Sequence, residues 1–222
     1  LTPLRPVIEG ALLCFICPTA TAAVVVTSKL GGRAGTTTAY TLLITLGVAI
    51  LVPLLVPLAH PQAGMGFAHA FSMILSKVFP LLLCPIVAAE LLRRLSPGLT
   101  GRLASFRDLP FHLWAVALAL ALAVTTRSLV TSHVSLVLAG GIALASLLAC
   151  IIQFAVGRLA GREYGDPISG AQSCGQKNTV FAIWMGYTFL TPVTALAGGF
   201  YSIWHNVYNS WQLAQMRKRN CQ

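Results

Sequence analysis

The chain has 222 residues, of which 56% are hydrophobic and 9% are charged, and its mean hydropathy is +0.79. A soluble domain carries roughly 25% charged residues, so this composition excludes a soluble fold and predicts an all-α integral membrane protein. The net charge of +10 does not indicate a nucleic-acid partner, because the basic residues stand in short gaps between apolar stretches.

Seven apolar stretches are long enough to cross a bilayer core of about 30 Å as helices, so the lipid bilayer is the first expected partner. We assign them all to a single transmembrane domain, residues 1–222. In chain order the predicted spans are Val7–Ser28, Thr36–Leu58, Ala68–Leu92, Leu109–Thr126, Val134–Val156, Ile168–Leu190 and Pro192–Met216.

Basic residues predict how these spans are oriented. On one side the gaps contain Arg127 alone, and Arg5 precedes the first span on that side. The other side receives eleven: Lys29, Arg33, Arg93, Arg94, Arg102, Arg107, Arg158, Arg162, Arg217, Lys218 and Arg219. Positively charged loops stay in the cytoplasm, so we expect a cytoplasmic C-terminus in a plasma membrane such as a bacterial inner membrane. Because an outside start without a signal peptide is unusual, we also expect further helices before Leu1.

The first span is interrupted by proline and small polar residues. Pro18 removes a backbone donor in mid-membrane and so leaves a carbonyl one turn earlier without its partner. Lipid cannot bond to this carbonyl, so protein, water or an ion must do so. The alternative is a simple kink, in which Thr19 or Thr21 bonds to the freed carbonyl. Cys14 and Cys17 have no further cysteine pair or histidine partner, so we expect no metal site there.

The sixth span begins with a polar half, residues 167–179. Gln172 and Gln176 are four residues apart and share a helix face, and Lys177 follows at membrane depth. A charge at the centre of a membrane helix costs roughly 2.5 to 3.5 kcal/mol on insertion scales, so such residues are functional candidates. The alternative is a lysine that extends to the membrane surface. Two interrupted helices with polar centres are typical of secondary transporters, which bind substrate and ions near the midplane.

Similarity to a known family lies in three segments: Cys17–Ala22 with the following Gly31-Gly32, Gly175–Asn178, and Ser202–Asn206. They resemble segments of the bile acid:sodium symporter family, which is grouped with arsenite and auxin-type carriers. The resemblance implies ten helices in two inverted repeats, whose fourth and ninth helices are interrupted and cross. The first and sixth spans here take those places, and about three N-terminal helices are then absent.

The resemblance also implies two moving parts. Residues 1–58 and 134–216 match core-domain helices, and residues 68–126 match panel-type helices against which the core moves. The binding site then lies in the core, beside the panel.

Only part of the family's sodium site carries over. Thr37, Thr41 and Gln176 match its ligands, whereas Gln172 stands where the family has an acidic residue, and a Ser-Asn pair is missing. Lys177 stands beside these residues. The resemblance therefore implies a cation-coupled protein with either sodium on an incomplete ligand set or Lys177 in place of sodium. Because burial favours the neutral form of a lysine, Lys177 could carry a transported proton. No other cofactor is expected.

The same motifs indicate where a substrate binds. The candidate substrate-binding residues are Pro18, Thr19, Thr21, Lys77, Asn178, His205 and Asn206. Lys77 could attract a carboxylate or sulfonate, or its side chain could extend to the membrane surface. Tyr201, His205 and Asn209 share one face of the last span, where hydrogen bonds between helices are an alternative explanation.

The sequence therefore predicts a secondary active transporter, not an enzyme, that carries a small organic or amphipathic anion by alternating access. The alternatives are a seven-helix membrane sensor or receptor and a membrane-embedded enzyme. An enzyme would need a Ser/His arrangement or paired acids at membrane depth, and no acidic residue is clearly placed there. A receptor does not need two interrupted polar helices.

Overall fold

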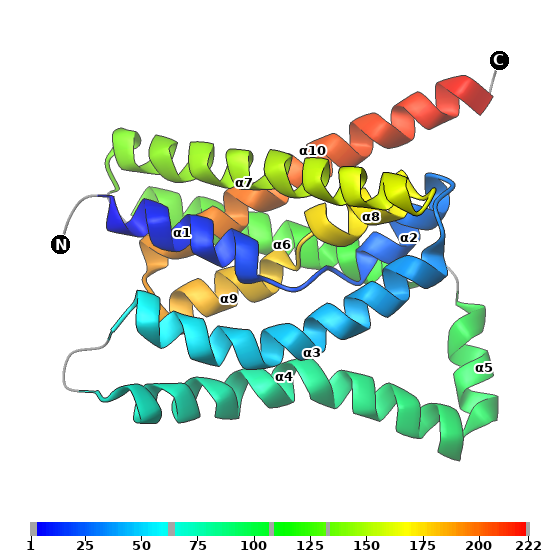
Figure 1. The fold of residues 1–222 in the computed structure, drawn as a ribbon, viewed down its shortest axis with the longest axis horizontal. Helices are drawn as coiled ribbons and strands as arrows, with labels where there is room; N and C mark the ends of the chain where they lie inside the picture. The colour runs from blue at the N-terminus through cyan, green and yellow to red at the C-terminus, as the bar shows by residue number, and fades with distance from the viewer. Residues whose placement is uncertain (1–3, 62–64, 107–108, 132–133, 221–222) are drawn as a thin grey trace.

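The computed structural model describes residues 4–61, 65–106, 109–131 and 134–220, and this part of the chain is helical without a β-strand. Arg107, which we used to predict the orientation, lies outside the described residues. The helices (Figure 1) are α1 (Arg5–Ile16), α2 (Ala22–Lys29), α3 (Ala34–Ala59), α4 (Phe67–Leu95), α5 (Pro97–Ser105), α6 (Leu109–Thr131), α7 (Leu136–Glu163), α8 (Pro167–Gly175), α9 (Thr179–Phe189) and α10 (Pro192–Asn220).

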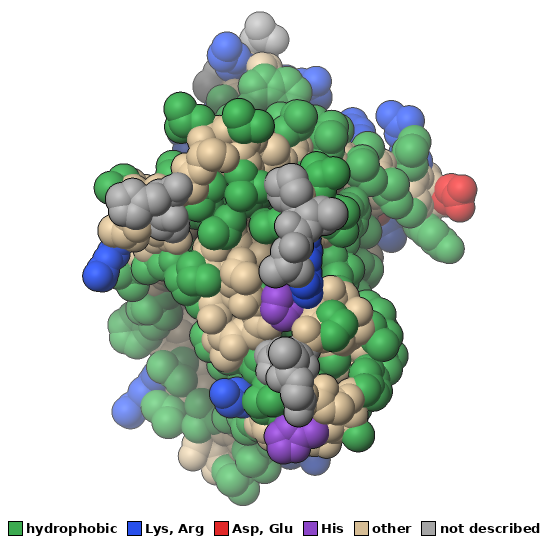
Figure 2. Space-filling view, turned by 90° about the vertical axis from the view of Figure 1, so that its left-hand side faces the viewer, with side chains coloured by type: hydrophobic (Ala, Val, Ile, Leu, Met, Phe, Trp, Pro, Cys, Tyr) green, Lys and Arg blue, Asp and Glu red, His purple; other side chains and the backbone are tan. Residues whose placement is uncertain are grey.

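Four helices are long and apolar enough to cross a membrane: α3, α4, α7 and residues His112–Thr131 of α6. Large apolar side chains are exposed on these helices, Leu43, Val130 and Leu136 among them. Hydrophobic side chains also cover much of the end of the bundle shown in Figure 2. Extensive exposed apolar surface marks a membrane or partner contact. The all-α prediction is confirmed for the described residues, and the four membrane-capable helices support a location in a bilayer.

Two of the predicted spans are broken in the middle, as their polar segments predict. Residues 17–21 separate α1 from α2, and residues 176–178 separate α8 from α9. The two breaks meet, because Thr19 and Lys177 form an isolated antiparallel β-bridge.

Backbone groups freed by one break are satisfied by the other. The amide of Ala20 donates to the carbonyl of Gln176 at 2.9 Å, and the amide of Asn178 donates to the carbonyl of Pro18 at 2.8 Å. Irregular backbone is tolerated at membrane depth only where protein or water satisfies it. The crossing therefore supplies much of the hydrogen bonding that the proline and the polar segment make necessary.

Two apolar clusters flank the crossing. One joins α1, α3, α4 and α9 and includes Val52, Ile74 and Met185. The other joins α1, α7, α8 and α10 and includes Ile142 and Leu196. Helix α4 packs along α3, whereas α6 packs against α10, α9 and α2.

Basic residues gather at one end of the bundle. Helices α2, α4, α5, α7 and α10 each carry Lys or Arg in the last turn. These helix ends lie together with the start of α3 at one end of the molecule (Figure 1). The basic residues of these helix ends, which stand in every second gap between the predicted spans, thus lie at the same end of the bundle.

Close packing of α7 on α8 depends on glycine. A Cβ atom on Gly170 of α8 would lie 2.2 Å from the carbonyl oxygen of Gly157 and 2.9 Å from the Cα of Gly161 in α7. Small residues allow helix backbones to approach this closely. The face of α8 that carries Gly170 therefore holds the polar half of the sixth span against α7.

We expect Gly170→Ala to lower the free energy of unfolding by about 1–3 kcal/mol, since the added methyl meets backbone that cannot rotate away. The measurement is the midpoint of thermal unfolding in detergent. Gly140→Ala, at a position in α7 with nothing within 4 Å of the new Cβ, is the control and should leave the midpoint unchanged or slightly higher. Equal losses in both variants would contradict the close approach.

Candidate functional site

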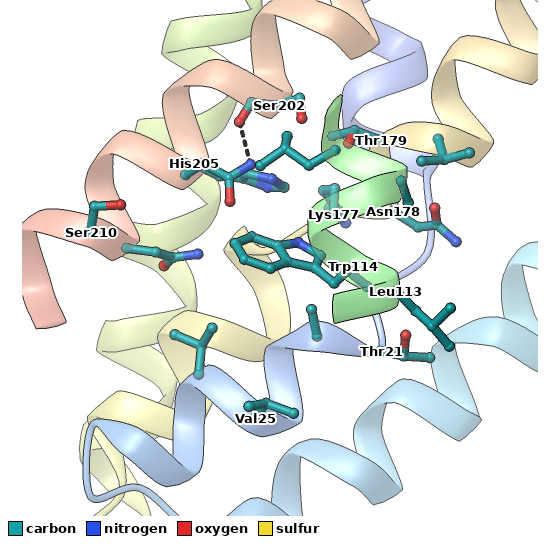
Figure 3. Close-up of a pocket in the computed structure, with 18 of the residues that line it drawn as sticks. Thr21, Val25, Leu113, Trp114, Lys177, Asn178, Thr179, Ser202, His205 and Ser210 are labelled. Carbon is teal, nitrogen blue, oxygen red and sulfur yellow. Dashed lines mark hydrogen bonds between the residues drawn. The ribbon is translucent and has the colours of Figure 1, made fainter. Parts of the chain in front are cut away.

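A cavity of about 460 Å³ lies beside the crossing, between α2, α6, the start of α9, and α10. Figure 3 shows Lys177 from the second break, Trp114 from α6 and His205 from α10 projecting toward this space. Much of the wall is apolar, including Val25 and Leu113. Among the described residues that line the cavity none is acidic, and two, Lys29 and Lys177, are basic.

Lys177 is a buried cation at the centre of the arrangement, with only 6% of its surface exposed. Its Nζ donates to the carbonyl oxygen of Phe15 at 3.3 Å. Phe15 lies in the last turn of α1, where carbonyls lack helical partners and the helix dipole is negative. Within the described residues Lys177 forms no ion pair. The side chain is therefore held by a helix end and buried within the bundle.

Buried polar atoms without a hydrogen-bond partner gather between α8 and α10. In the described part of the chain they are Gln172 Oε1, Ser173 Oγ, both side-chain polar atoms of Gln176, Ser202 Oγ, His205 Nδ1 and Asn209 Nδ2. Ser202, His205 and Asn209 also line the cavity. Leaving a buried polar group unpaired costs about 1–3 kcal/mol, and folded proteins tolerate few of them. This concentration is typical of a site that binds a polar ligand.

The predicted ion-site residues make separate sets of contacts. Thr37 donates its hydroxyl to Thr27 Oγ1 at 3.1 Å, and Thr41 donates to the carbonyl of Thr37 at 2.7 Å. Gln172 instead faces α10, where its Nε2 donates to Asn209 Oδ1 at 3.0 Å and to a second side-chain carbonyl, that of Gln212, at 2.9 Å. No hydrogen bond between described residues joins the two threonines to Gln172, Gln176 or Lys177. Among the described residues, no group of three or more His, Cys, Asp and Glu side chains is arranged so that it could hold a metal ion.

Four of the predicted substrate residues line the cavity: Thr21, Asn178, His205 and Asn206. The side chain of Asn178 also begins α9, since its Oδ1 accepts from the amide of Phe181. Asn206 donates to the carbonyl of Ser202, drawn as a dashed line in Figure 3.

The other three predicted substrate residues lie elsewhere. Pro18 and Thr19 hold the crossing together, since Thr19 donates its hydroxyl to the carbonyl of Ser173 at 2.6 Å. Lys77 is exposed on α4, with its Nζ 5.6 Å from the centre of the Phe189 ring, and does not line the cavity. The sequence analysis placed Lys77 at the substrate because it lies in a segment that matches the panel helices, beside which the substrate was expected to bind.

Two residues of the last predicted span hold α10 to α8, as the alternative explanation predicts. The hydroxyl of Tyr201 donates to the carbonyl of Gly175 at 2.8 Å, and Asn209 accepts from Gln172. The ring of Tyr201 packs edge-on against His205, with centroids 5.6 Å apart. The Nδ1 of His205, like the Nδ2 of Asn209, has no hydrogen-bond partner among the described residues.

Among the residues of the cavity wall that sequence reasoning missed are Ser202, Lys29 and Trp114. Ser202 stands three residues before His205, so the helical repeat was a usable signal. Lys29 appeared only as a topology signal. Nothing local marks Trp114, because α6 reaches the cavity only through tertiary packing.

Sequence reasoning also missed a buried acid. Glu9 is 3% exposed and lies in α1. Its Oε1 lies 2.6 Å from Arg5 Nε and 2.8 Å from His60 Nδ1, and its Oε2 accepts from the hydroxyl of Thr194 at 3.3 Å. Arg5 is four residues earlier, but His60 ends α3 and Thr194 begins α10. This Glu9 cluster (Arg5, Glu9, His60 and Thr194) thus ties three helices together at the opposite end of α1 from Phe15.

An ion pair between Asp166 and Arg33 lies at the basic end of the bundle, outside the membrane-spanning helices. Asp166 caps α8 by accepting from the amide of Ser169 at 3.1 Å, and its Oδ2 lies 3.5 Å from Arg33 Nε. Burial opposes ionisation of this carboxyl, but the hydrogen bonds from Ser169 and the contacts with Arg33 outweigh it, so the pKa of Asp166 is lowered. The pair joins the start of α3 to the start of α8.

Because the pKa of Asp166 is lower in the folded state, its contribution to stability is present above the unfolded value of about 4 and disappears as the pH falls through the folded value. We expect the midpoint of thermal unfolding to fall as the pH drops below about 4, and Asp166→Asn to flatten that fall. Glu163→Gln, an exposed acid in the same corner, is the control. A wild-type pH profile reproduced by Asp166→Asn would contradict the assignment.

Comparison with models of known protein families and with curated protein sequences finds no match for this chain. The function must therefore be argued from the residues and their geometry. Chemically, the cavity offers the buried Lys177 side chain, hydrogen-bond donors and an apolar wall, and none of the described residues that line it is acidic. Such a site suits a ligand that carries negative charge on an apolar body.

Proposed function

We propose that the protein is a secondary active transporter of a small organic or amphipathic anion. The observation that carries the proposal is the crossing of two broken helices in mid-bundle, with the buried Lys177 beside a cavity. Discontinuous helices that expose polar backbone and side chains at the midplane are how secondary transporters build their sites. The resemblance of the three sequence segments to the bile acid:sodium symporter family supports the same assignment.

The substrate class follows from the charge and shape of the cavity. Lys29 and the buried Lys177 line it, and none of its described lining residues is acidic. Asn209 Nδ2 is an unused donor there. An apolar wall that includes Leu113 and Trp114 accepts a hydrocarbon body. We therefore propose a carboxylate or sulfonate with an apolar body, of which bile acids are one kind.

Coupling is proposed to use Lys177 in place of sodium. The family's acidic ligand is absent, and the threonines that match its neutral ligands bond to each other and to Thr27. An ammonium held by the C-terminal carbonyls of α1 supplies positive charge where a cation would otherwise bind. Release and return of its proton would then couple transport to pH.

Alternating access is proposed to involve α6. In this scheme the chain crosses a plasma membrane seven times, with its C-terminus in the cytoplasm. The core, residues 1–58 and 134–216, moves against panel-type helices within residues 68–126. The cavity lies between α6 of the panel and α2, α9 and α10 of the core, so relative motion of these parts would open and close it.

The first test measures ligand binding and does not require transport to be observed. The midpoint of thermal unfolding of the full-length protein is measured in sodium chloride and in potassium chloride, with and without taurocholate or benzoate, at several pH values. A ligand of the folded state at one hundred times its dissociation constant stabilises by about 2.7 kcal/mol. We expect stabilisation by at least one anion and none specific to sodium. A sodium-specific rise would contradict the role of Lys177.

Uptake into proteoliposomes then separates a transporter from a sensor. The anion that stabilises the protein most is supplied in radiolabelled form, with a pH gradient across the vesicle membrane. We expect saturable uptake driven by the gradient. Binding without uptake would overturn transport and favour the sensor.

A further inference from the structure

A second cavity, of about 400 Å³, lies at the basic end of the bundle, between α7, α8 and the C-terminal part of α10. It shares no lining residue with the cavity at the crossing. Six of its lining residues decide its chemistry: Leu30, Arg158, Ile168, Trp211, Met216 and Arg219. It is therefore a separate site, independent of the proposed transport.

Two arginines from different helices border this second cavity. Arg158 lies on α7 and Arg219 in the last turn of α10, and both are exposed. Within the described residues neither forms an ion pair, and no described lining residue is acidic. Two unpaired guanidinium groups on one cavity favour a phosphate, because the planar fork of arginine matches phosphate oxygens.

Apart from Gln212 and Gln215, the other residues that line the second cavity are apolar. Leu30 is buried, Ile168 and Met216 are half-buried, and Trp211 is 56% exposed. A free phosphate ion has no use for such a surface, whereas a phospholipid has acyl chains to cover it. Tryptophan is enriched at the level of lipid headgroups, where its ring contacts both chains and water.

We propose that the second cavity binds an anionic phospholipid, with Arg158 and Arg219 on the phosphate and Trp211 and Met216 against the acyl chains. Charge complementarity selects this occupant. The cavity lies at the end where basic residues gather, and basic pockets between membrane helices on that side bind anionic headgroups. A lipid there also bridges α7 and α10, whose C-terminal ends diverge in Figure 1.

The test compares lipids on the purified full-length chain. Binding of dioleoyl phosphatidylglycerol and dioleoyl phosphatidylcholine is measured by native mass spectrometry and by the midpoint of thermal unfolding. A basic residue near an anionic headgroup contributes about fivefold in affinity, so Arg158→Gln with Arg219→Gln should weaken phosphatidylglycerol binding about 25-fold. The matched control, Arg162→Gln with Arg217→Gln, removes the same charge from the same two helices outside the cavity and should change binding less than about threefold.

A second measurement does not depend on the folding of the arginine variants. Phosphatidylglycerol with brominated acyl chains should quench the fluorescence that Trp211→Phe removes, and brominated phosphatidylcholine at the same concentration should not. Equal quenching by both lipids would overturn the proposal. So would equal weakening by the two arginine pairs, which indicates diffuse attraction, or displacement of the lipid by millimolar inorganic phosphate, which indicates a soluble anion.

Discussion

Replacing Lys177 with methionine is expected to lower the initial rate of anion uptake about 100-fold and to remove its dependence on a pH gradient. Methionine keeps much of the volume of the side chain but removes the only ammonium at the crossing of the described breaks. Loss of the ammonium that would pair with the negative charge of the substrate costs roughly 2–5 kcal/mol in a buried site. A tenfold change in rate corresponds to about 1.4 kcal/mol, so a loss of about 100-fold lies within this range. The measurement is uptake of the anion identified by thermal stabilisation, in proteoliposomes.

Two further variants make the Lys177 result specific. Lys77→Met removes an exposed lysine that does not line the cavity, and its uptake should stay within about twofold of the wild type. Lys177→Arg keeps the charge but cannot lose its proton near neutral pH, so binding should persist while the pH dependence is lost. Because an unpaired buried charge is unfavourable, Lys177→Met should not lower the midpoint of thermal unfolding. Unchanged pH-driven uptake by Lys177→Met would refute the assignment.

Replacing Glu9 with glutamine is expected to lower the free energy of unfolding by about 2–3 kcal/mol. The variant leaves Arg5 without its carboxylate partner and breaks the charged contact to His60 in a site where the Glu9 side chain is 4% exposed. Removing one partner of a buried pair costs roughly 3–5 kcal/mol, and the partial exposure of Arg5 and His60 reduces this figure. For a chain of this size each kcal/mol lowers the midpoint by roughly 2–4 °C, so a fall of about 4–12 °C is expected.

Glu90→Gln is the matched control for the Glu9 cluster. Glu90 is another helical glutamate and pairs with two arginines, Arg93 and Arg94, but its side chain is 39% exposed. Exposed ion pairs are screened by water and contribute little to stability, so the midpoint of Glu90→Gln should fall much less than that of Glu9→Gln. If both variants lose the same stability, burial is not what makes the Glu9 cluster important.

Features that depend on local sequence were predictable. The proline and small residues after Cys17 and the polar run that ends at Thr179 predicted two interruptions, and the helices end and begin again there. The reason is local: proline removes a backbone donor within the helix, and polar groups in an apolar stretch must find partners other than lipid. Lys177 could be chosen in the same way, because a charge in an apolar stretch is conspicuous.

Features that depend on partners far along the chain were not predictable. Thr37, Thr41 and Gln172 were grouped as ligands of one ion, yet they bond within α2 and α3 or across to α10. Lys77 was placed at the substrate, although it lies against Phe189 on another face. Residue type and spacing describe which groups share a helix face, but not which other helix that face meets.

The sequence by itself therefore determined the helical class, the membrane-compatible apolar surface, the two breaks and the charge asymmetry, since each follows from composition or from backbone chemistry within a few residues. Only the tertiary structure decided that the breaks satisfy each other, as in the bond from Thr19 to Ser173, 154 residues apart. It also decided that Trp114 completes the cavity wall and that Glu9 is buried beside His60. These pairings arise because buried polar groups must find partners, and in this fold most of those partners come from other helices.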